Sequence, residues 1–166
     1  MKKNLFAFVF PLIFLSVLFS GCSSKKDGQI KIGIAKIIQH PALDDIEKGV
    51  MDVIKENKIN AVFDLQNANG DPNTAVQIAN QYKVKKVDVA VGIATPVAVA
   101  LATTLKDIPV VFGTVTDPLG AGLVDTLEHG KNNVTGMSDA IPTVEHIKLF
   151  AKVTGIKKLG YIYTSN

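Results

Sequence analysis

Small and polar residues follow apolar runs at four places in the sequence, and their side chains could bind a small charged ligand. These positions are Gln39 with His40, Ala94 with Thr95 and Pro96, Thr116 with Asp117, and Ser138 with Asp139. If the apolar runs are parallel strands of one sheet, the residues after them line one crevice, because ligands bind beyond the carboxyl ends of such strands. We therefore expect a binding crevice rich in hydroxyl, amide and carboxylate groups.

These residue types suit an amino-acid zwitterion, which carries both a carboxylate and an ammonium. Thr95 before Pro96 is typical of a helix N-cap followed by proline at the first helical position, which leaves backbone N–H groups free to bind an anion. One carboxylate, Asp139 or Asp117, would bind the ammonium. The alternative is structural, because Asp before proline often caps a turn and Asp after serine often caps a helix.

The elements that would position these residues alternate between short apolar runs and amphipathic segments, as in a βαβ series. The pattern predicts strands at 30–38, 59–65, 87–93 and 108–115, and helices that begin at Pro41, at Pro72 behind an Asp71 cap, and at Pro96. Helical spacing predicts that the first two helices bury Leu43, Ile46, Val50, Val53 and Ile54, then Ala75, Ile78, Ala79 and Tyr82. The predicted fold class is α/β, with a doubly wound parallel sheet.

The remaining sequence predicts the start of a second unit. It contains a short helix at 119–127, a strand around Val134, a helix at 144–153 and a strand at 158–164. No helix follows that last strand to cover it, so we expect the chain to be a fragment of a longer protein. The expected domains are a first α/β lobe at 30–141 and, from a crossover at Pro142, the start of a second lobe at 142–166.

The amino terminus has the pattern of an exported protein. Two lysines precede an apolar run at 5–19 and then small residues before Cys22, which predicts a signal peptide at 1–21 and a solvated tether at 22–29. The segment resembles a bacterial lipobox, although the place where Leu is preferred holds Phe19. This resemblance implies a lipid on Cys22 and anchoring to the extracytoplasmic face of a bacterial membrane.

The composition limits the kinds of partner. All 18 basic residues are lysines, so a ligand carboxylate would be bound by amides, hydroxyls or lysine rather than by an arginine fork. Without residues 1–21 the chain has 16 lysines and 15 acidic residues, and this balance argues against a nucleic-acid partner. Cys22 is the only cysteine, which rules out an internal disulfide or a cysteine zinc site.

The sequence gives no sign of an enzyme. It lacks the GxSxG, HExxH, Walker and GxGxxG motifs, so we expect no catalytic residues and no cofactor. Glu128 and His129 are adjacent, and adjacent side chains on a helix diverge, so we also expect no metal site.

Three of the polar segments together resemble the substrate-binding lipoproteins of ABC transporters, including the tryptophan- and tyrosine-binding members. They read GIATPVAVAL, VTDPLGAGLV and NVTGMSD, and the likeness extends from about residue 31 to 166. It implies a type I periplasmic-binding-protein fold with two lobes, a membrane permease and an ATPase as partners, and an aromatic amino acid as ligand. It also implies ligand contacts at Thr95, Pro96, Thr116, Asp117, Ser138 and Asp139, with a further ligand-facing loop beginning at Ser165 and Asn166.

The function expected from these observations is that of a lipid-anchored solute receptor for an ABC importer, which binds a small zwitterion between two lobes. The alternative is the ligand-sensing extracellular domain of a signalling system built on the same fold. A third possibility, an exported α/β hydrolase or racemase, predicts turnover of the ligand.

Overall fold

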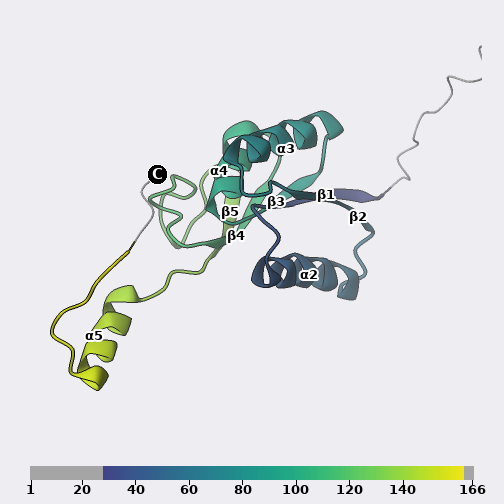
Figure 1. The fold of residues 1–166 in the computed structure, drawn as a ribbon. Helices are drawn as coiled ribbons and strands as arrows, with labels where there is room; N and C mark the ends of the chain where they lie inside the picture. The colour runs from purple at the N-terminus through teal and green to yellow at the C-terminus, as the bar shows by residue number, and fades with distance from the viewer. Residues whose placement is uncertain (1–27, 163–166) are drawn as a thin grey trace, which may run out of the picture.

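Five parallel strands form one sheet in the computed structural model, which describes residues 28–162 (Figure 1). The strands are β1 (Ile30–Lys36), β2 (Ala61–Asn67), β3 (Val89–Ile93), β4 (Val110–Val115) and β5 (Val134–Ser138). They lie in the order β2-β1-β3-β4-β5, and every neighbouring pair is parallel. This confirms the predicted α/β class with its doubly wound parallel sheet. The boundaries between signal, tether and lobes stay predictions.

Helices cover both faces of the sheet (Figure 1). The helix α2 (Pro41–Glu56) connects β1 to the outer strand β2, whereas α3 (Pro72–Lys85) and α4 (Thr95–Thr104) connect strands in the opposite direction. Because crossovers between parallel strands are right-handed, a reversal of direction places the helices on opposite faces. Accordingly, α3 and α4 pack together on one face and α2 lies on the other.

Two predicted helix starts are confirmed. Asp71 caps α3, and its carboxylate accepts hydrogen bonds from the backbone N–H groups of Asn73 (2.9 Å) and Thr74 (3.3 Å). The helix α2 begins at Pro41, with the ring of His40 accepting a bond from a backbone amide two residues on. Both prolines lie in the first helical turn, where the missing N–H has no intrahelical partner to lose.

The buried faces agree with the helical spacing except at one residue. Ala75, Ile78, Ala79 and Tyr82 of α3 are all buried, as predicted. In α2, Leu43, Ile46, Val50 and Ile54 pack against the sheet, but Val53 is 57% exposed. Val53 follows Val50 by three residues, so the spacing admits it, but it lies at one edge of the packed stripe, and Met51 packs inward at the other edge.

A tyrosine of α3 packs against the strands β1 and β2. The Tyr82 side chain is completely buried, and its hydroxyl donates a 2.8 Å hydrogen bond to the Asp64 carbonyl. The ring passes so close to β1 that a methyl group at Gly33 would lie 2.7 Å from it. Gly33 therefore gives the aromatic ring access to the backbone of the strand.

The predicted helix at 119–127 is wrong. The segment between β4 and β5 forms turns instead, including hydrogen bonds from the Ala121 amide to the Asp117 carbonyl and from the Leu123 amide to the Pro118 carbonyl. Gly122 has a φ of 69°. Glycines favour such turns and disfavour helices, because they adopt positive φ without strain and lose more conformational freedom in a helix.

The end of the described chain extends away from the sheet (Figure 1). The predicted helix at 144–153 is confirmed as α5 (Thr143–Thr154), which buries no residue. The predicted strand at 158–164 is not formed over residues 158–162, where Ile162 is 98% exposed. A strand needs a neighbouring strand to pair its backbone groups, and this segment has none within residues 28–162.

Candidate functional site

The predicted ligand-binding residues lie along one edge of the sheet. Because the strands are parallel, the residues that follow β1, β3, β4 and β5 lie beyond the same carboxyl edge, at neighbouring positions in the strand order. This places Gln39, His40, Ala94, Thr95, Pro96, Thr116, Asp117, Ser138 and Asp139 on one rim of the lobe. That they bind a ligand stays a prediction.

The residues after β4 and β5 are bonded to each other. The Thr116 hydroxyl donates a 3.1 Å hydrogen bond to the Asp139 carboxylate, and the Ser138 hydroxyl donates one of 3.3 Å to the Thr116 carbonyl. The Ser138 hydroxyl also accepts a bond from the Ala140 amide at 3.1 Å. Asp139 is exposed, so its carboxylate is held in place by one hydroxyl while it remains open to solvent.

Asp117 has a structural role. Its carboxylate accepts a 2.8 Å hydrogen bond from the Gly120 amide, and a methyl group at Gly120 would lie 2.2 Å from the other carboxylate oxygen. It therefore closes the turn after β4, which is the structural alternative that the Asp-Pro pair predicted. Of the two candidate acids, Asp139 is the better placed to bind an ammonium.

The start of α4 differs from the prediction by one residue. The N-cap is Ala94 rather than Thr95, and no side chain caps this helix end. Thr95 and Pro96 occupy the first two helical positions, so the Thr95 hydroxyl does not serve as the predicted cap. The first intrahelical bond runs from the Ala98 amide to the Ala94 carbonyl, which leaves the amides of Thr95 and Val97 ahead of it. These amides suit an anion.

Ala94 has a strained backbone. Its φ of 79° and ψ of 153° lie in a region that is essentially restricted to glycine. Its amide donates a 3.0 Å bond to the Gly113 carbonyl of β4, which holds the turn against the neighbouring strand. Thr114, on that strand, has a φ of 57° at an irregularity in the pairing of β4 with β5. Strain and bulges of this kind cluster at binding sites.

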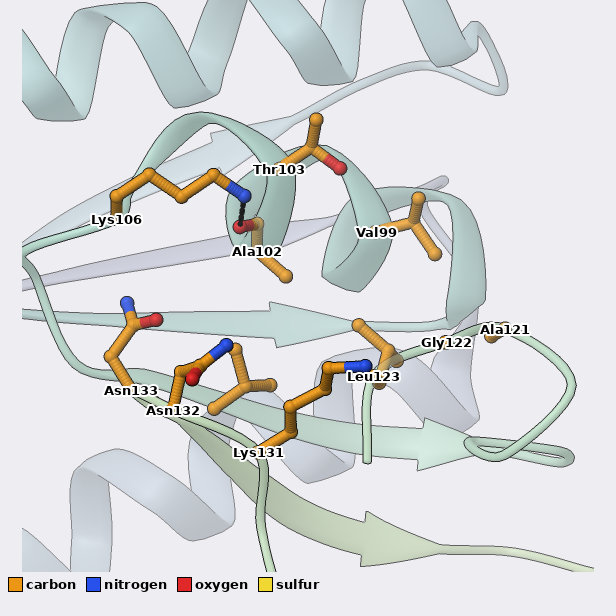
Figure 2. A pocket seen from close by; sticks show the side chains of 11 residues that line it. Val99, Ala102, Thr103, Lys106, Ala121, Gly122, Leu123, Lys131, Asn132 and Asn133 are labelled. Carbon is orange, nitrogen blue, oxygen red and sulfur yellow. Dashed lines mark hydrogen bonds between the residues drawn. The ribbon is translucent and has the colours of Figure 1, made fainter. Parts of the chain in front are cut away.

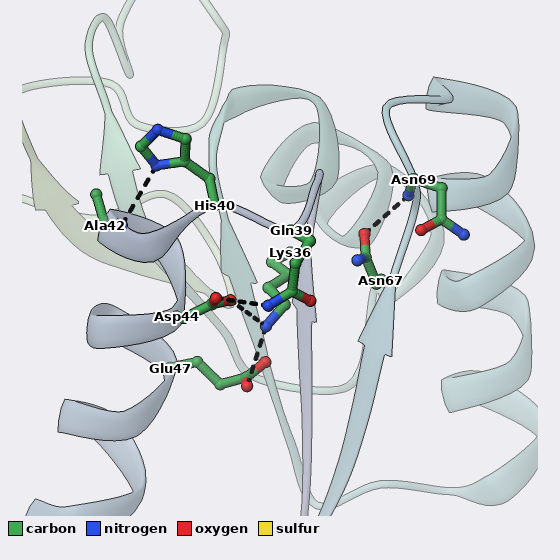
Figure 3. Close-up of polar contacts among 8 residues, drawn as sticks. All are labelled: Lys36, Gln39, His40, Ala42, Asp44, Glu47, Asn67 and Asn69. Atoms are coloured by element: carbon green, nitrogen blue, oxygen red, sulfur yellow. Dashed lines mark hydrogen bonds and ion pairs between the residues drawn. The ribbon is translucent and has the colours of Figure 1, made fainter.

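The residues after β1 are engaged with α2 (Figure 3). The Gln39 amide donates a 2.5 Å hydrogen bond to Asp44, and the ring of His40 accepts a bond from the Ala42 amide at 3.3 Å. His40 therefore acts as the N-cap of α2. Both side chains are exposed at the rim, so these bonds hold them without burying them.

A buried lysine lies beneath this rim and was missed from the sequence. Lys36, at the end of β1, is 7% exposed, and its ammonium contacts the carboxylates of Asp44 (2.6 Å) and Glu47 (3.2 Å) (Figure 3). Burial lowers the pKa of Lys36, but the hydrogen bonds with the two acids outweigh it, and its pKa is raised. The sequence does contain a signal for this ion pair, namely a lysine at the end of a buried strand. A buried charge of this kind needs acidic partners.

Asp44 links this ion pair to the rim. One of its oxygens accepts from Lys36 and the other from Gln39. The hydrogen bond from Lys36 holds the pKa of Asp44 below its usual value, and the bond from Gln39 acts in the same direction. Because Lys36 is buried and its ammonium already pairs with two carboxylates of the lobe, it does not offer an open cation to a ligand carboxylate.

The cavity shown in Figure 2 lies away from the predicted site. It has a volume of about 290 Å³ between α4 and the segments at 121–123 and 131–134. Its polar groups bond within the chain: Lys106 donates to the Ala102 carbonyl at 3.1 Å, and Asn133 donates to the carbonyls of Leu105 and Ile108. None of the predicted ligand-binding residues lines this cavity.

Three predicted positions cannot be placed. Cys22, Ser165 and Asn166 lie outside the described residues. Within residues 28–162, no cluster of three His, Cys, Asp or Glu side chains could hold a metal ion. In the same part of the chain no helix has the length and apolar character required to cross a membrane.

The fold and this rim define one lobe of an α/β ligand-binding protein, and the comparison with known families gives its class. Residues 31–166 match the family model described as ABC transporter substrate binding protein. The chain therefore belongs to the ABC transporter substrate-binding protein family. The family model and the tyrosine-binding relative both describe substrate-binding proteins.

Relatives and solved structures agree with this assignment. A tyrosine-binding protein of Clostridioides difficile is 37% identical over 86% of this chain and 42% of its own length. A conserved domain protein of Vibrio cholerae has a TM-score of 0.72 at 44% identity, covering 76% of this chain and 44% of that one. An ABC domain from Streptococcus pneumoniae, solved in complex with L-Trp, has a TM-score of 0.70 at 37% identity, covering 74% and 43%. The chain spans about half the length of the curated relatives it matches.

Proposed function

We propose that this protein is the solute-binding lipoprotein of an ABC importer and that it captures an aromatic amino acid. Membership of the substrate-binding family supports the transport role. The tyrosine-binding relative and the L-Trp complex of a similar domain support the ligand class. A diacylglycerol anchor on Cys22 would hold the protein at the extracytoplasmic face of the membrane, where a permease and an ATPase are its partners.

The main support for an amino acid as ligand is that one rim has both a group that attracts an anion and a group that attracts a cation. The amides at the start of α4 and the Thr95 hydroxyl attract a carboxylate, since the positive end of the helix dipole favours an anion. On the same rim, two strands further along the sheet, the Asp139 carboxylate is held by Thr116 and open to solvent. An α-amino acid carries both matching groups.

The second half of the pocket comes from the other lobe. A ligand that bonds to both lobes favours the closed state by its difference in affinity for the two states. We therefore expect the described lobe to bind the amino and carboxylate groups, and the opposing lobe to contact the aromatic ring. On this basis the 166-residue chain binds more weakly than a chain of the relatives' length.

The test is isothermal calorimetry on the mature protein extended to the length of its relatives, with tyrosine, tryptophan, phenylalanine, a branched-chain amino acid, a purine and a sugar. We expect heat of binding with at least one aromatic amino acid and none with the sugar. The same titration of the 166-residue chain should give an affinity at least about 100-fold lower, because one set of contacts is missing. No heat with any aromatic amino acid would remove the proposed ligand class.

A further inference from the structure

Lysines gather at the end of the lobe opposite the candidate site. All five strands begin at this end, and α2, α3 and α4 finish there (on the right in Figure 1). Residues at strand starts and helix ends therefore share one surface, which we name the basic end. Eight of the ten lysines between residues 28 and 141 lie on it: Lys31, Lys55, Lys58, Lys83, Lys85, Lys86, Lys106 and Lys131. Six of these eight are exposed, and Lys31 and Lys131 are half-buried.

Few acids neutralise the basic end. The acids at the same helix ends and strand starts are Glu56, Asp88 and Asp107. Two more pair with its lysines from neighbouring segments, Asp64 with Lys85 at 2.5 Å and Asp125 with Lys131 at 2.9 Å. Even with all five counted, lysines are in excess.

The opposite end of the lobe carries the reverse charge. Its acids are Asp44, Asp45, Glu47, Asp71, Asp117 and Asp139. Of the lysines near them, Lys36 is buried between two of these acids, and Lys48, next to Glu47 in the middle of α2, pairs with Asp52. The lobe is therefore strongly polarised along the strand direction. Such a separation of charge orients a protein near a charged surface even when its net charge is small.

Helix dipoles account for only part of this pattern. Lys55, Lys83 and Lys85 lie in last helical turns, where a cation is favoured by the negative end of the dipole. Lys86 is the C-cap of α3, and Lys106 donates a hydrogen bond to the Ala102 carbonyl of α4, so both are also favoured by a helix end. The remaining three, Lys31, Lys58 and Lys131, lie at strand starts or in turns outside the helices.

The basic end is also where the tether joins the lobe. The strand β1 begins at Ile30, directly after the predicted tether at 22–29. Eight residues span at most about 27 Å. A lipid on Cys22 would thus keep the basic end closer to the membrane than any other part of the lobe.

We propose that the basic end of this lobe docks on anionic phospholipid headgroups of the membrane to which the protein is anchored. The proposal rests on the proposed function through the anchor on Cys22. Each lysine near an anionic surface strengthens binding, and the attraction acts over about 8 Å at physiological salt. A docked lobe directs the candidate site and its acidic rim away from the lipid.

The experiment anchors the mature chain chemically through Cys22, the only cysteine, to a maleimide phospholipid. The vesicles contain phosphatidylcholine alone, or with about one third phosphatidylglycerol as the anionic component. Acetylation of individual lysines is followed by mass spectrometry. We expect Lys58, Lys83 and Lys86 to react about tenfold more slowly on anionic vesicles at roughly 0.15 M salt and to lose this protection at about 1 M. Equal rates on both vesicles, or equal protection of Lys148 and Lys152 of α5, would overturn the proposal.

A matched pair of variants tests the same surface without an anchor, in a Cys22→Ser background. One variant changes five basic-end lysines to glutamine, at Lys55, Lys58, Lys83, Lys86 and Lys106. The control removes the same charge elsewhere, at Lys48, Lys148, Lys152, Lys157 and Lys158. The first should lower co-sedimentation with anionic vesicles at least about tenfold and the control much less. Equal losses would show that only net charge matters, which contradicts a docking surface.

These readouts are independent of ligand binding. Chemical coupling replaces cellular lipidation, so an unlipidated Cys22 in cells would refute the anchor without affecting the measured lipid contact. Calorimetry of the basic-end variant in the extended protein should give the parent's affinity for the amino acid. A failure of the docking proposal and a failure of the transport proposal are thus distinguishable.

Discussion

The Asp139 carboxylate illustrates how one exposed side chain can be directed toward a ligand. Thr116, on the neighbouring strand end, donates a hydrogen bond to it, and the Ser138 hydroxyl bonds to the Thr116 carbonyl. Two strand ends are thereby joined by side chains immediately before the predicted crossover at Pro142. A carboxylate fixed in this way loses little conformational freedom when an ammonium binds.

We expect Asp139→Asn to abolish most of the affinity for an amino acid while leaving the fold intact. The amide keeps the size of the side chain but loses the charge that pairs with the ammonium, and the affinity should fall at least about 30-fold. Calorimetry on the extended protein measures this loss. Asp125→Asn is the control, since Asp125 pairs with Lys131 away from the rim. An unchanged affinity in Asp139→Asn would show that this acid only caps the strand end.

A second prediction concerns the ion pair under the rim. Asp44→Asn should lower the thermal unfolding midpoint by several degrees, because Lys36 is buried and would keep only Glu47 as a charged partner. It should also weaken ligand binding if Gln39 contacts the ligand, since Asp44 holds the Gln39 amide. Differential scanning calorimetry and ligand titration measure the two effects. Asp45→Asn, at the adjacent exposed position, should change neither.

At the scale of elements, the start of α4 combines backbone strain with a free helix end. We expect Ala94→Gly to stabilise the fold by about 1 kcal/mol, because relief of the strained φ and ψ exceeds the entropy that glycine adds to the unfolded chain. Urea denaturation measures the change. The control is Ala98→Gly, inside the helix and fully buried, which should destabilise by at least about 1 kcal/mol through lost helix propensity and a lost packed methyl group. Destabilisation by both substitutions would mean that Ala94 is not strained.

Sequence periodicity predicted the elements that pack on each other. The four buried residues of α3, the cap at Asp71 and the start at Pro72 follow from helical spacing and N-cap chemistry, which are local properties. The prediction that Val53 is buried was wrong because helical spacing admits residues at the edge of the stripe, and only the packing against the sheet decides which edge is covered. The predicted helix at 119–127 is not formed, because Gly120 and Gly122 favour turns over a helix.

The rim was predictable as a set of strand ends, but its internal bonding was not. The grouping of Thr95, Thr116 and Asp139 follows from parallel topology alone. The cap at Ala94 and the irregularity at Thr114 depend on how β3, β4 and β5 fit together, and no local pattern encodes a positive φ at alanine or threonine. For the same reason the sequence did not decide whether Asp117 binds the ligand or caps its turn.

At the scale of the whole molecule, stability should fall at both extremes of pH. The Asn73 amide and the Thr74 hydroxyl hold the pKa of Asp71 below 3.8, and the Lys36 hydrogen bond lowers the pKa of Asp44. Groups with a lowered folded pKa stabilise the fold above their unfolded pKa and lose that contribution as the pH falls through the folded one. Burial raises the pKa of the Tyr82 hydroxyl, with smaller effects from Asp64 and Glu47. Its contribution is therefore present below about pH 10 and lost above it.

Two variants distinguish the loss of stability in acid from the loss in alkali, as measured by urea unfolding at pH 3, 7 and 11. Asp71→Asn keeps an N-cap side chain that does not titrate, so it should lose less stability than the parent between about pH 7 and 3. Tyr82→Phe should be destabilised at neutral pH by about 1 kcal/mol, through loss of the bond to the Asp64 carbonyl, but should lose less than the parent at alkaline pH. If Asp71→Asn loses as much unfolding free energy as the parent between pH 7 and 3, Asp71 is not among the acids responsible.

The contact between Tyr82 and Gly33 joins two positions 49 residues apart, and substitutions at the two positions should be correlated among homologues. No side chain fits at position 33 while an aromatic ring covers it. A homologue with alanine at position 33 should therefore have a smaller residue at position 82. A homologue with a small residue at position 82 has no need of the glycine. Among homologous genes these two sites should therefore vary as a size-compensated pair.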